Sequence, residues 1–361
     1  MSLKVVLLAS LDNIHTIRWA NGLASRNLKV HVISAHPASK LFAISPKVAQ
    51  HILKVKAPLG YIFSTFEIKK LIKKIQPDLV NAHYATGYGT LARLVNFQPT
   101  IISVWGSDVY DFPKKSFLHR ALLRKNLRFA TAIASTSNCM ANETKKTHLH
   151  NNFFITPFGV DTNLFFPKNK TKHNNDLVIG TVKTLHYKYG IDTLIEAFSM
   201  VKKRYQGKKK LKLEITGDGN LLKNLQIMVN KLGLNNEVKF YQAVSHNKVP
   251  DMLNRLDIYV ALSRLDSESF GVAIIEASAC AKPVVVSDAD GLSEVTLAGK
   301  TGLIVAKNNP LEAANAIMKL INNDELRNSM GKEGRKHVLE NYSWEKSLDL
   351  MIDAYQHVTK L

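Results

Sequence analysis

The feature that most limits the fold of this chain is a repeated alternation of short β-rich runs with amphipathic helical stretches. In the first half, apolar runs such as 4–10 (KVVLLAS) and 29–35 (KVHVISA) alternate with helical periods such as 15–27 (HTIRWANGLASRN). This alternation is typical of parallel sheets covered by helices. A polar, Lys- and Asn-rich stretch without periodicity, 163–175, interrupts the pattern, which then restarts. We therefore predict an α/β fold with two doubly wound domains.

The same alternation predicts the domain boundaries. At 361 residues the chain is too long for one ordinary core and about right for two domains. We expect one Rossmann-like domain over residues 1–165 and a second over residues 176–340. Residues 341–361 (NYSWEKSLDLMIDAYQHVTKL) have the pattern of a further amphipathic helix. Ligands of open parallel sheets bind beyond the carboxyl ends of the strands, so two such domains predict a shared cleft.

The charge of the chain is positive and uneven. The net charge is +20, and residues 1–165 carry 21 Lys and Arg against 7 Asp and Glu, whereas residues 166–361 carry 28 against 22. A basic first half suggests an anionic partner, whether nucleic acid, a membrane surface or a phosphorylated substrate. The sequence has no apolar run of 18 residues, no signal-peptide pattern and no recognisable pairing of Cys139 with Cys280. These absences predict a cytoplasmic chain.

Two classes of protein with comparable patterns lack their signatures here. A nicotinamide-dependent Rossmann enzyme needs G-x-G-x-x-G after an early strand, and this sequence has ASLDNIHT at that place. A nucleic-acid-binding protein would explain the charge, but no RRM, KH, zinc-finger or recognition-helix signature is present. We therefore expect no nucleic-acid partner. A basic nucleic-acid- or membrane-binding protein remains as an alternative.

One stretch of the second half, 268–288 (ESFGVAIIEASACAKPVVVSD), places the charged Glu276 inside an apolar run. Glu268 stands eight residues earlier, just before Ser-Phe-Gly. A helix that begins after Gly271 offers unpaired N–H groups and a positive end to an anion. A carboxylate can accept hydrogen bonds from sugar hydroxyls. A sugar- and phosphate-binding site therefore stands beside a second interpretation, in which Glu268 is solvated and Glu276 is a capping or paired residue.

The segment 264–305, which contains this stretch, closely resembles the donor site of the retaining glycosyltransferases called GT4, or glycosyl transferases group 1. Glu268 and Glu276 match the E-x7-E signature of that family, and TPFGVDTNLF (156–165) and ITGDGNLLKNL (215–225) also have counterparts in it. The resemblance implies the GT-B fold, in which two Rossmann-like domains face a central cleft and a C-terminal helix crosses back to the first. It also implies transfer of a sugar from a nucleotide-sugar with retained configuration, without a metal ion or other cofactor.

The resemblance implies roles for the donor residues. Glu276 would bind the ribose hydroxyls, and Glu268 the hydroxyls of the donor sugar. Lys183 and Lys188, in GTVKTLHYKYGID, match a basic pair that usually contains Arg, although no Arg is present here and Tyr189 intervenes. Two lysines can stabilise a departing diphosphate as point charges, and a solvated loop position is the alternative for Lys188. The other predicted donor residues are Ser269, Phe270, Gly271, Val272 and Gly217.

In the first half, the resemblance implies a role for polar residues near strand ends and the first helix. His83 (in VNAHYATGYG) matches a histidine whose surroundings face the reacting sugar, and a satisfied core histidine is the alternative. Helix capping is the alternative for the residues near helix starts. No general base is assigned, because the leaving diphosphate is expected to help deprotonate the acceptor. The predicted catalytic residues are Lys183, Lys188, Glu268 and His83, and the predicted acceptor or cleft residues are His15, Thr16, Arg18 and Asp108.

The basic first half is the expected acceptor half. Two stretches, 66–76 (FEIKKLIKKIQ) and 112–129 (FPKKSFLHRALLRKNLRF), mix lysines and arginines with apolar residues, as helices at anionic membrane surfaces do. Ordinary core faces with solvated lysines are the alternative. We expect a UDP- or GDP-sugar donor and a glycan or polyprenyl-diphosphate-linked acceptor in cell-surface polysaccharide or lipopolysaccharide biosynthesis, at the inner face of the membrane. Another GT-B enzyme, a nucleotide-sugar epimerase or a phosphorylase, is the alternative.

Overall fold

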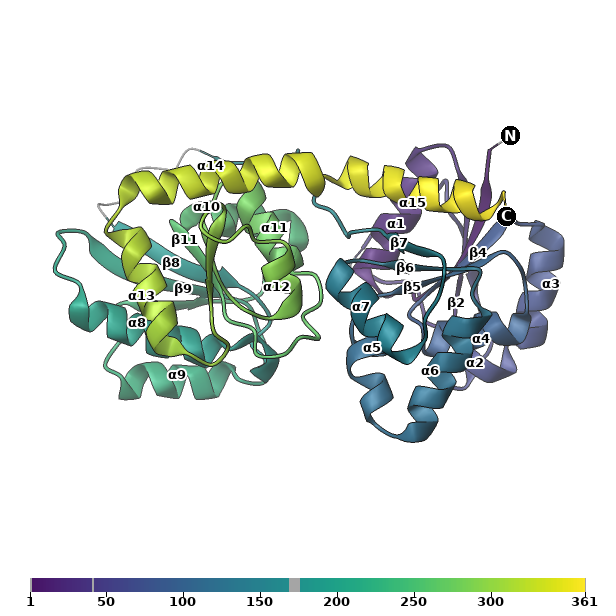
Figure 1. Cartoon of the computed structure of the whole chain (residues 1–361), viewed down its shortest axis with the longest axis horizontal. Helices are drawn as coiled ribbons and strands as arrows, with labels where there is room; N and C mark the ends of the chain where they lie inside the picture. Colours follow the sequence, from purple (N-terminus) through teal and green to yellow (C-terminus); the bar gives the residue numbers. More distant parts are fainter. Residues whose placement is uncertain (1, 41, 169–175, 361) are drawn as a thin grey trace. The chain divides into compact units, whose positions relative to one another are not determined.

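The computed structural model describes residues 2–40, 42–168 and 176–360, and it divides the chain into two compact units (Figure 1). Unit 1 contains the chain up to Phe158 and from Glu345 onward, and unit 2 is Gly159–Trp344. Each unit is built on one all-parallel sheet. The two Rossmann-like α/β domains expected from the sequence are therefore confirmed.

Unit 1 has a seven-stranded sheet in the order β3-β2-β1-β4-β5-β6-β7. The order reverses between β1 and β4, which is where ligands bind in open α/β sheets. The strands are β1 (Lys4–Leu8), β2 (Lys29–Ser34), β3 (Ala49–Ile52), β4 (Leu79–His83), β5 (Thr100–Val104), β6 (Ala132–Ser135) and β7 (Phe153–Ile155). The helices are α1 (Ile14–Ser25), α2 (Gly60–Phe63), α3 (Thr65–Ile75), α4 (Gly87–Val95), α5 (Ser107–Tyr110), η1 (Phe112–Lys114), α6 (Phe117–Phe129), α7 (Asn138–Thr147) and α15 (Trp344–Val358).

The central strands of unit 1 are rich in apolar residues because both faces of the sheet are covered. Every residue of β4 and β5 is buried. Helices α3, α4, α6 and α7 pack on one face, where their apolar side chains join those of the strands in a single core. Strand β3 is the one strand that we did not predict. It pairs with β2 at the edge of the sheet and has no buried residue, so its sequence AQHI carries no apolar signal.

Helix α15 covers the other face of this sheet together with α1 (Figure 1). Its buried residues form a stripe at helical spacing that includes Leu348, Met351 and Tyr355. Asn81 of β4 donates a hydrogen bond from Nδ2 to the Tyr355 hydroxyl over 2.7 Å. Asp349 pairs with Arg26 at 2.9 Å. The end of the described chain therefore belongs to unit 1.

Unit 2 has a six-stranded sheet in the order β10-β9-β8-β11-β12-β13, which reverses between β8 and β11. Helices α8, α9 and α13 pack on one face of it. The strands are β8 (Asp176–Val182), β9 (Lys210–Thr216), β10 (Val238–Tyr241), β11 (Ile258–Ala261), β12 (Val284–Ser287) and β13 (Gly302–Val305). The helices are η2 (Tyr187–Tyr189), α8 (Ile191–Arg204), α9 (Leu222–Lys231), η3 (His246–Lys248), α10 (Val249–Arg255), α11 (Val272–Ala279), α12 (Asp290–Glu294), α13 (Pro310–Ile321) and α14 (Asp324–Asn341).

The division between the units differs from the expected bounds at residues 165 and 341. Val160 bridges to Ser343 within unit 2, and Phe165 is fully buried there, so both chain crossings are anchored to the second unit. The predicted linker 163–175 is consequently in part an ordered segment. The Lys168 amide donates to Asn254 Oδ1 over 2.9 Å, and residues 169–175 lie outside the described residues.

In the parts of the chain that the structure describes, no helix combines the length and apolar character needed to cross a membrane.

Candidate functional site

The predicted donor residues of unit 2 gather at the carboxyl ends of the two central strands. Lys183 directly follows β8, and Glu268 lies in the loop between β11 and α11. These two strands are neighbours at the point where the strand order reverses. The fold therefore brings together residues that are 85 positions apart in the sequence.

Glu268 forms a buried ion cluster with the two predicted lysines. Lys183 Nζ lies 2.6 Å from Glu268 Oε1, and Lys188 Nζ lies 3.3 Å from Glu268 Oε2. Lys188 also donates to the Ser267 carbonyl over 2.8 Å. The Tyr189 ring lies below the Lys183 ammonium, 4.5 Å from ring centroid to Nζ. Tyr189, which interrupts the expected basic pattern, thus packs against both lysines.

The electrostatics of this cluster favour the charged forms. Burial disfavours the Lys183 ammonium, but the Glu268 carboxylate together with Tyr189 and Tyr259 outweighs that effect, so the pKa of Lys183 is raised. Burial likewise acts to raise the pKa of Glu268, but Lys183 and Lys188 outweigh it, so that pKa is lowered. Glu268 is therefore an ionised, ion-paired residue, not the solvated carboxylate of the alternative interpretation. Two ammonium groups face one carboxylate, which leaves positive charge for an anionic ligand.

Helix α11 begins immediately after this cluster. Gly271, the residue just before the helix, has a φ of +74°. That left-handed conformation favours glycine and turns the chain sharply into the helix. Gly291 fixes the preceding segment, because a Cβ atom there would lie 2.2 Å from the Phe270 amide nitrogen. The Phe270 ring packs edge-on against Tyr342. Ser269 and Phe270 are both buried, and Val272 is the first residue of the helix.

Glu276 lies on α11 and is only 8% exposed. Its Oε1 is 2.9 Å from Nε2 of His246, at the start of η3. From the family resemblance we expect the ribose of a ligand to supply the partner of this carboxylate. The structure corrects that expectation in one respect, because a protein side chain already pairs with one of its oxygens. No local pattern signals His246, which lies 30 positions earlier in the chain.

Gly217 follows β9 with a φ of +152°. A Cβ atom at this position would lie 2.0 Å from the Lys183 carbonyl oxygen. Only glycine lets the two strand ends approach this closely. The structure therefore gives Gly217 a packing role beside Lys183.

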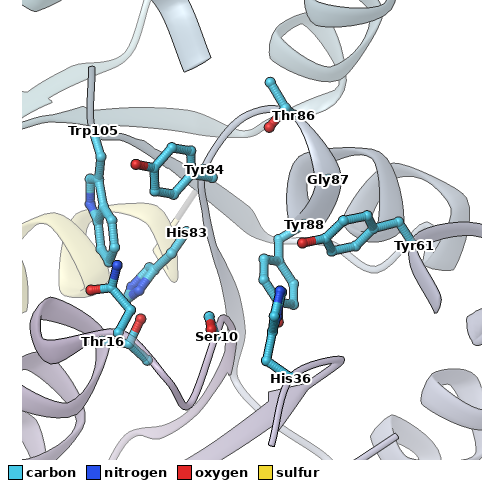
Figure 2. Close-up of a pocket in the computed structure, with 11 residues that line it drawn as sticks. Ser10, Thr16, His36, Tyr61, His83, Tyr84, Thr86, Gly87, Tyr88 and Trp105 are labelled. Atoms are coloured by element: carbon cyan, nitrogen blue, oxygen red, sulfur yellow. The ribbon is translucent and has the colours of Figure 1, made fainter. Parts of the chain in front are cut away.

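Unit 1 contains a cavity of about 260 Å³ beyond the ends of β1, β2, β4 and β5 (Figure 2). It lies where the strand order of this sheet reverses. Of the residues predicted from the first half, Thr16 and His83 line it. His15, Arg18 and Asp108 do not. The other lining residues are Ser10, Asn13, His36, Tyr61, Tyr84, Thr86, Gly87, Tyr88 and Trp105.

His83 is the last residue of β4 and is 2% exposed. Within the described structure, neither of its ring nitrogens has a hydrogen-bond partner, and the same holds for the Thr16 hydroxyl. Burial, together with the nearby His15, lowers the pKa of His83 to about 3. The imidazole is therefore neutral at neutral pH, with one donor and one acceptor to offer to a ligand. This state differs from the satisfied core histidine of the alternative interpretation.

The turn after His83 is unusual. Tyr84 has a φ of +73°, a left-handed conformation that is costly for a bulky residue, by roughly 1–3 kcal/mol. Two backbone hydrogen bonds hold it, from the Tyr84 amide to the Ser103 carbonyl and from the Gly89 amide to the Tyr84 carbonyl. Strain of this kind concentrates at functional sites. The Tyr84 ring packs edge-on against Trp105, which follows β5, and both rings line the cavity near His83 (Figure 2).

One side of the cavity is aromatic, which the sequence did not predict. Tyr88 Oη lies 2.8 Å from His36 Nδ1 and accepts a hydrogen bond from the Ala35 amide at 3.1 Å. The Tyr61 ring packs edge-on against Tyr88, with 5.2 Å between centroids. These residues come from the end of β2, α2 and α4, so no sequence spacing links them. Aromatic faces beside polar groups are common in pockets for small ligands.

Asp108 connects the two loops that follow β4 and β5 through backbone hydrogen bonds. Its Oδ1 accepts hydrogen bonds from the amides of Trp105 (3.1 Å) and Gly106 (2.9 Å), and its Oδ2 accepts one from Ala85 (2.9 Å). Burial raises the pKa of Asp108 in spite of these bonds. The carboxylate thus ties the loop after β5 to the loop after β4. Its contacts are those of a positioning residue.

The other two predicted residues lie on α1. The His15 ring stacks on Phe158 with 4.0 Å between centroids, and its amide donates to Asn13 Oδ1, the helix cap. Arg18 is partly buried on the same helix. His15 therefore borders the wall of the cavity formed by Trp105, with ring centroids 6.0 Å apart, without lining it.

Comparison with known proteins agrees with this geometry. Residues 163–337 match the family model of glycosyl transferases group 1, and residues 4–137 match that of glycosyl transferase 4-like proteins. An uncharacterized glycosyltransferase of Methanocaldococcus jannaschii is 28% identical over 313 residues, which cover 86% of this chain and 84% of that protein. The chain belongs to the GT4-type glycosyltransferases.

Two further relatives extend the comparison. The capsular polysaccharide biosynthesis glycosyltransferase CapM of Staphylococcus aureus is 26% identical over 360 residues, 92% of either chain. The crystal structure of Anabaena HepE in complex with UDP superposes with a TM-score of 0.81 at 17% identity, over 99% of this chain and 100% of that one. The fold is therefore that of GT-B enzymes, as the sequence analysis expected.

Proposed function

We propose that this enzyme transfers a sugar from a UDP- or GDP-sugar to a glycan or lipid-linked glycan, with retention of the anomeric configuration. The observation that carries the proposal is the buried cluster of Lys183, Glu268 and Lys188 beside the start of α11. A helix N-terminus and two ammonium groups suit a diphosphate. HepE was solved with UDP, which supports UDP as the first donor to test.

The charged residues of the donor site each have a role in this proposal. Lys183 and Lys188 stabilise the negative charge that develops on the leaving diphosphate. Glu268, held between them, orients the two ammonium groups and accepts hydrogen bonds from the donor sugar. Glu276 binds the ribose hydroxyls, with His246 orienting the carboxylate. The amides of Phe270, Gly271 and Val272 meet the phosphates.

No metal ion is needed in this proposal, because the lysines and the helix end supply the positive charge that a cation otherwise would. Catalysis then depends on positioning and on electrostatic stabilisation. The leaving diphosphate helps to deprotonate the acceptor on the same face of the sugar, which gives retention. His83 contributes as a neutral hydrogen-bonding group, since its pKa of about 3 keeps it uncharged.

The acceptor side of the proposal is the cavity of unit 1. Its unpartnered Thr16 hydroxyl and His83 ring offer hydrogen bonds to hydroxyl groups. Its aromatic side, Tyr61 and Tyr88, offers apolar faces to a sugar ring. The likeness to a capsular polysaccharide enzyme supports a role in cell-surface polysaccharide or lipopolysaccharide synthesis. The positive charge of the first half supports action at the inner, anionic surface of a membrane.

A calorimetric screen of UDP, GDP, ADP and their sugar conjugates, with and without a divalent cation, tests the proposal. We expect saturable binding of one nucleotide without metal, and loss of binding in Glu276→Ala. An anomeric analysis of the product by NMR then tests retention. Absence of nucleotide binding, with tight binding to oligonucleotides, would sink the assignment of the site. Phosphate-dependent cleavage of a glycan, or interconversion of a free nucleotide-sugar, would instead identify a phosphorylase or an epimerase.

A further inference from the structure

Four large apolar side chains lie on the solvent side of the short helical segment around α2. Leu59, Ile62, Phe63 and Phe66 have the spacing of one side of a helix. They are 61%, 58%, 68% and 79% exposed. Such a stripe normally faces a core, but here the buried residues are Gly60 and Ser64 on the other side. We call these four residues the α2 stripe.

The α2 stripe is the densest group of its kind on the described surface. Of the eighteen large apolar side chains that are exposed there, six lie between residues 52 and 66. Single exposed apolar residues are ordinary in soluble proteins, whereas a contiguous group marks a surface that meets another phase or molecule. The local sequence therefore places an apolar surface in water without a folding reason for it.

Lysines surround the α2 stripe. Residues 52–74 contain six lysines, all exposed, and a single acidic residue, Glu67, whose Oε2 accepts a hydrogen bond from the Lys54 amide. Helix α3 directs Ile68 and Ile72 into the core and leaves its lysines outside. The lysines of this segment are Lys54, Lys56, Lys69, Lys70, Lys73 and Lys74.

This arrangement corrects the membrane face expected from the sequence. Ile68, Ile72 and Ile75 of α3 are core residues, and in α6 so are Leu123 and Leu127. Only Phe117 and Leu118, at the start of α6, remain exposed in that stretch. The apolar surface comes instead from the segment 59–66, which reaches only the first turn of α3 and contains no lysine.

The same segment also contributes to the cavity. Tyr61 stands between Gly60 and Ile62 and points into the cavity toward Tyr88 (Figure 2). Its ring packs over Gly87, where a Cβ atom would lie 2.5 Å from the ring. One turn of helix therefore carries the apolar surface on one side and a wall of the cavity on the other.

We propose that the α2 stripe inserts into the interface of a bilayer that contains anionic phospholipid, with the surrounding lysines on the headgroups. Phe and Leu side chains on a helix that lies in the interface, with Lys beside them, are the chemistry of such contacts. The six exposed lysines of residues 52–74 favour an anionic partner over a basic one, and the stripe supplies an apolar contact that a purely ionic partner would not need. Docking there holds the cavity next to the lipid surface, where a lipid-linked acceptor would be. The functional benefit of the contact therefore rests on the proposed acceptor, whereas the contact itself does not.

The test is co-sedimentation with phosphatidylcholine vesicles that contain or lack phosphatidylglycerol. Wild-type protein is expected to bind the anionic vesicles and to dissociate as salt is raised. The double variant Phe63→Ser with Phe66→Ser should lose at least about tenfold in vesicle affinity. A matched control, Ile227→Ser with Leu311→Ser, removes two exposed apolar side chains from unit 2 and should bind as wild type does.

Two readouts keep the outcomes distinct. Calorimetric nucleotide binding should be unchanged in the stripe variant, so failure of the docking surface and failure of the donor site are separate results. Equal vesicle binding by wild type and stripe variant, or no binding by wild type, would overturn the inference. Sedimentation velocity adds a third outcome, because self-association that the stripe variant abolishes would replace the membrane with a second copy of this chain.

Discussion

Lys183 Nζ lies 2.6 Å from Glu268 Oε1, and this pair joins the ends of the two central strands of unit 2. The site is preorganised, because the Lys183 ammonium is already charged and held in position by Glu268. A second lysine, Lys188, lies with its Nζ 3.3 Å from the other Glu268 carboxylate oxygen, Oε2. A diphosphate that enters would meet positive charge without prior rearrangement of the backbone.

Removal of the two lysines should abolish most of the activity. We expect Lys183→Ala with Lys188→Ala to lower kcat by at least about 10²-fold, because the charge on the leaving group loses its partners. The exposed Lys223, on α9, provides the control, and Lys223→Ala should leave kcat unchanged. Lys183→Ala alone should cost about 1–3 kcal/mol in the free energy of unfolding, since Glu268 stays buried with one partner fewer. Urea unfolding separates that effect from catalysis.

The ribose assignment predicts a loss of binding at Glu276. Glu276→Ala should weaken nucleotide affinity by roughly 10–100-fold, the value of hydrogen bonds to a charged group. Glu325→Ala, at an exposed carboxylate of α14, is the control. An unchanged dissociation constant in calorimetry would contradict the assignment.

His246 should affect the same binding more weakly. Because it holds Glu276 Oε1 at 2.9 Å, its removal frees the carboxylate to adopt other orientations without deleting it. We expect His246→Ala to weaken nucleotide binding by about 3–10-fold. The double variant should be no weaker than Glu276→Ala alone, and simple additivity of the two losses would show that His246 acts by another route.

His83 should make unit 1 sensitive to acid. An unfolded histidine binds a proton below about pH 6.5, whereas the folded residue stays neutral down to about pH 3. The unfolded state therefore binds more protons in that window, and stability that is complete above pH 6.5 is lost as pH falls. At about pH 4.5 the loss from this residue is roughly 2–3 kcal/mol.

The measurement is the free energy of unfolding between neutral pH and about pH 4.5, for wild type and His83→Leu. The variant has no titrating group at this position, so its stability should fall less steeply than that of wild type. Identical pH dependence would mean that His83 already carries a charge or a partner in solution.

Asp108 should matter to stability and to the cavity without touching a ligand. Asp108→Ala leaves three backbone amides without their acceptor, and we expect a loss of roughly 2–4 kcal/mol in unfolding free energy. KM for the acceptor should rise while nucleotide affinity stays the same. A stable variant with unchanged KM would show that the two loops hold their positions without this carboxylate.

Metal independence predicts that chelation has no effect. Transfer in the presence of excess EDTA should proceed at the same rate as without it, because Lys183 and Lys188 carry the charge. A rate that EDTA lowers and Mg²⁺ or Mn²⁺ restores would contradict this proposal.

The sequence predicts the strands best where they are buried on both faces. The runs 79–83 (LVNAH) and 100–104 (TIISV) are mostly apolar, and each forms a central strand that is buried along its whole length. Strand β3 was not predicted, because an edge strand with partly or fully exposed residues has no apolar run. Glu268 and Lys183 were predicted through their resemblance to a known site, which compensates for a separation of 85 residues.

Residues that function through distant neighbours could not be predicted in this way. The pairing of His246 with Glu276, and of His36 with Tyr88, depends on tertiary contacts between separate elements. The stripe of α3 shows the converse case. Its periodicity is the same whether the face meets a core or a membrane, and only the fold decided that Ile68 and Ile72 lie inside.

Helix α15 has a consequence for how this protein is made. Asn81 and its hydrogen-bond partner Tyr355 are 274 positions apart. The face of β4 that α15 covers therefore stays open to water until α15 has left the ribosome. Unit 2, lying between them in the sequence, can complete its own core first. Unit 1, which begins first, is therefore completed after unit 2, and a chain cut before Glu345 would leave Asn81 Nδ2 without its Tyr355 partner and this face of the sheet open to water.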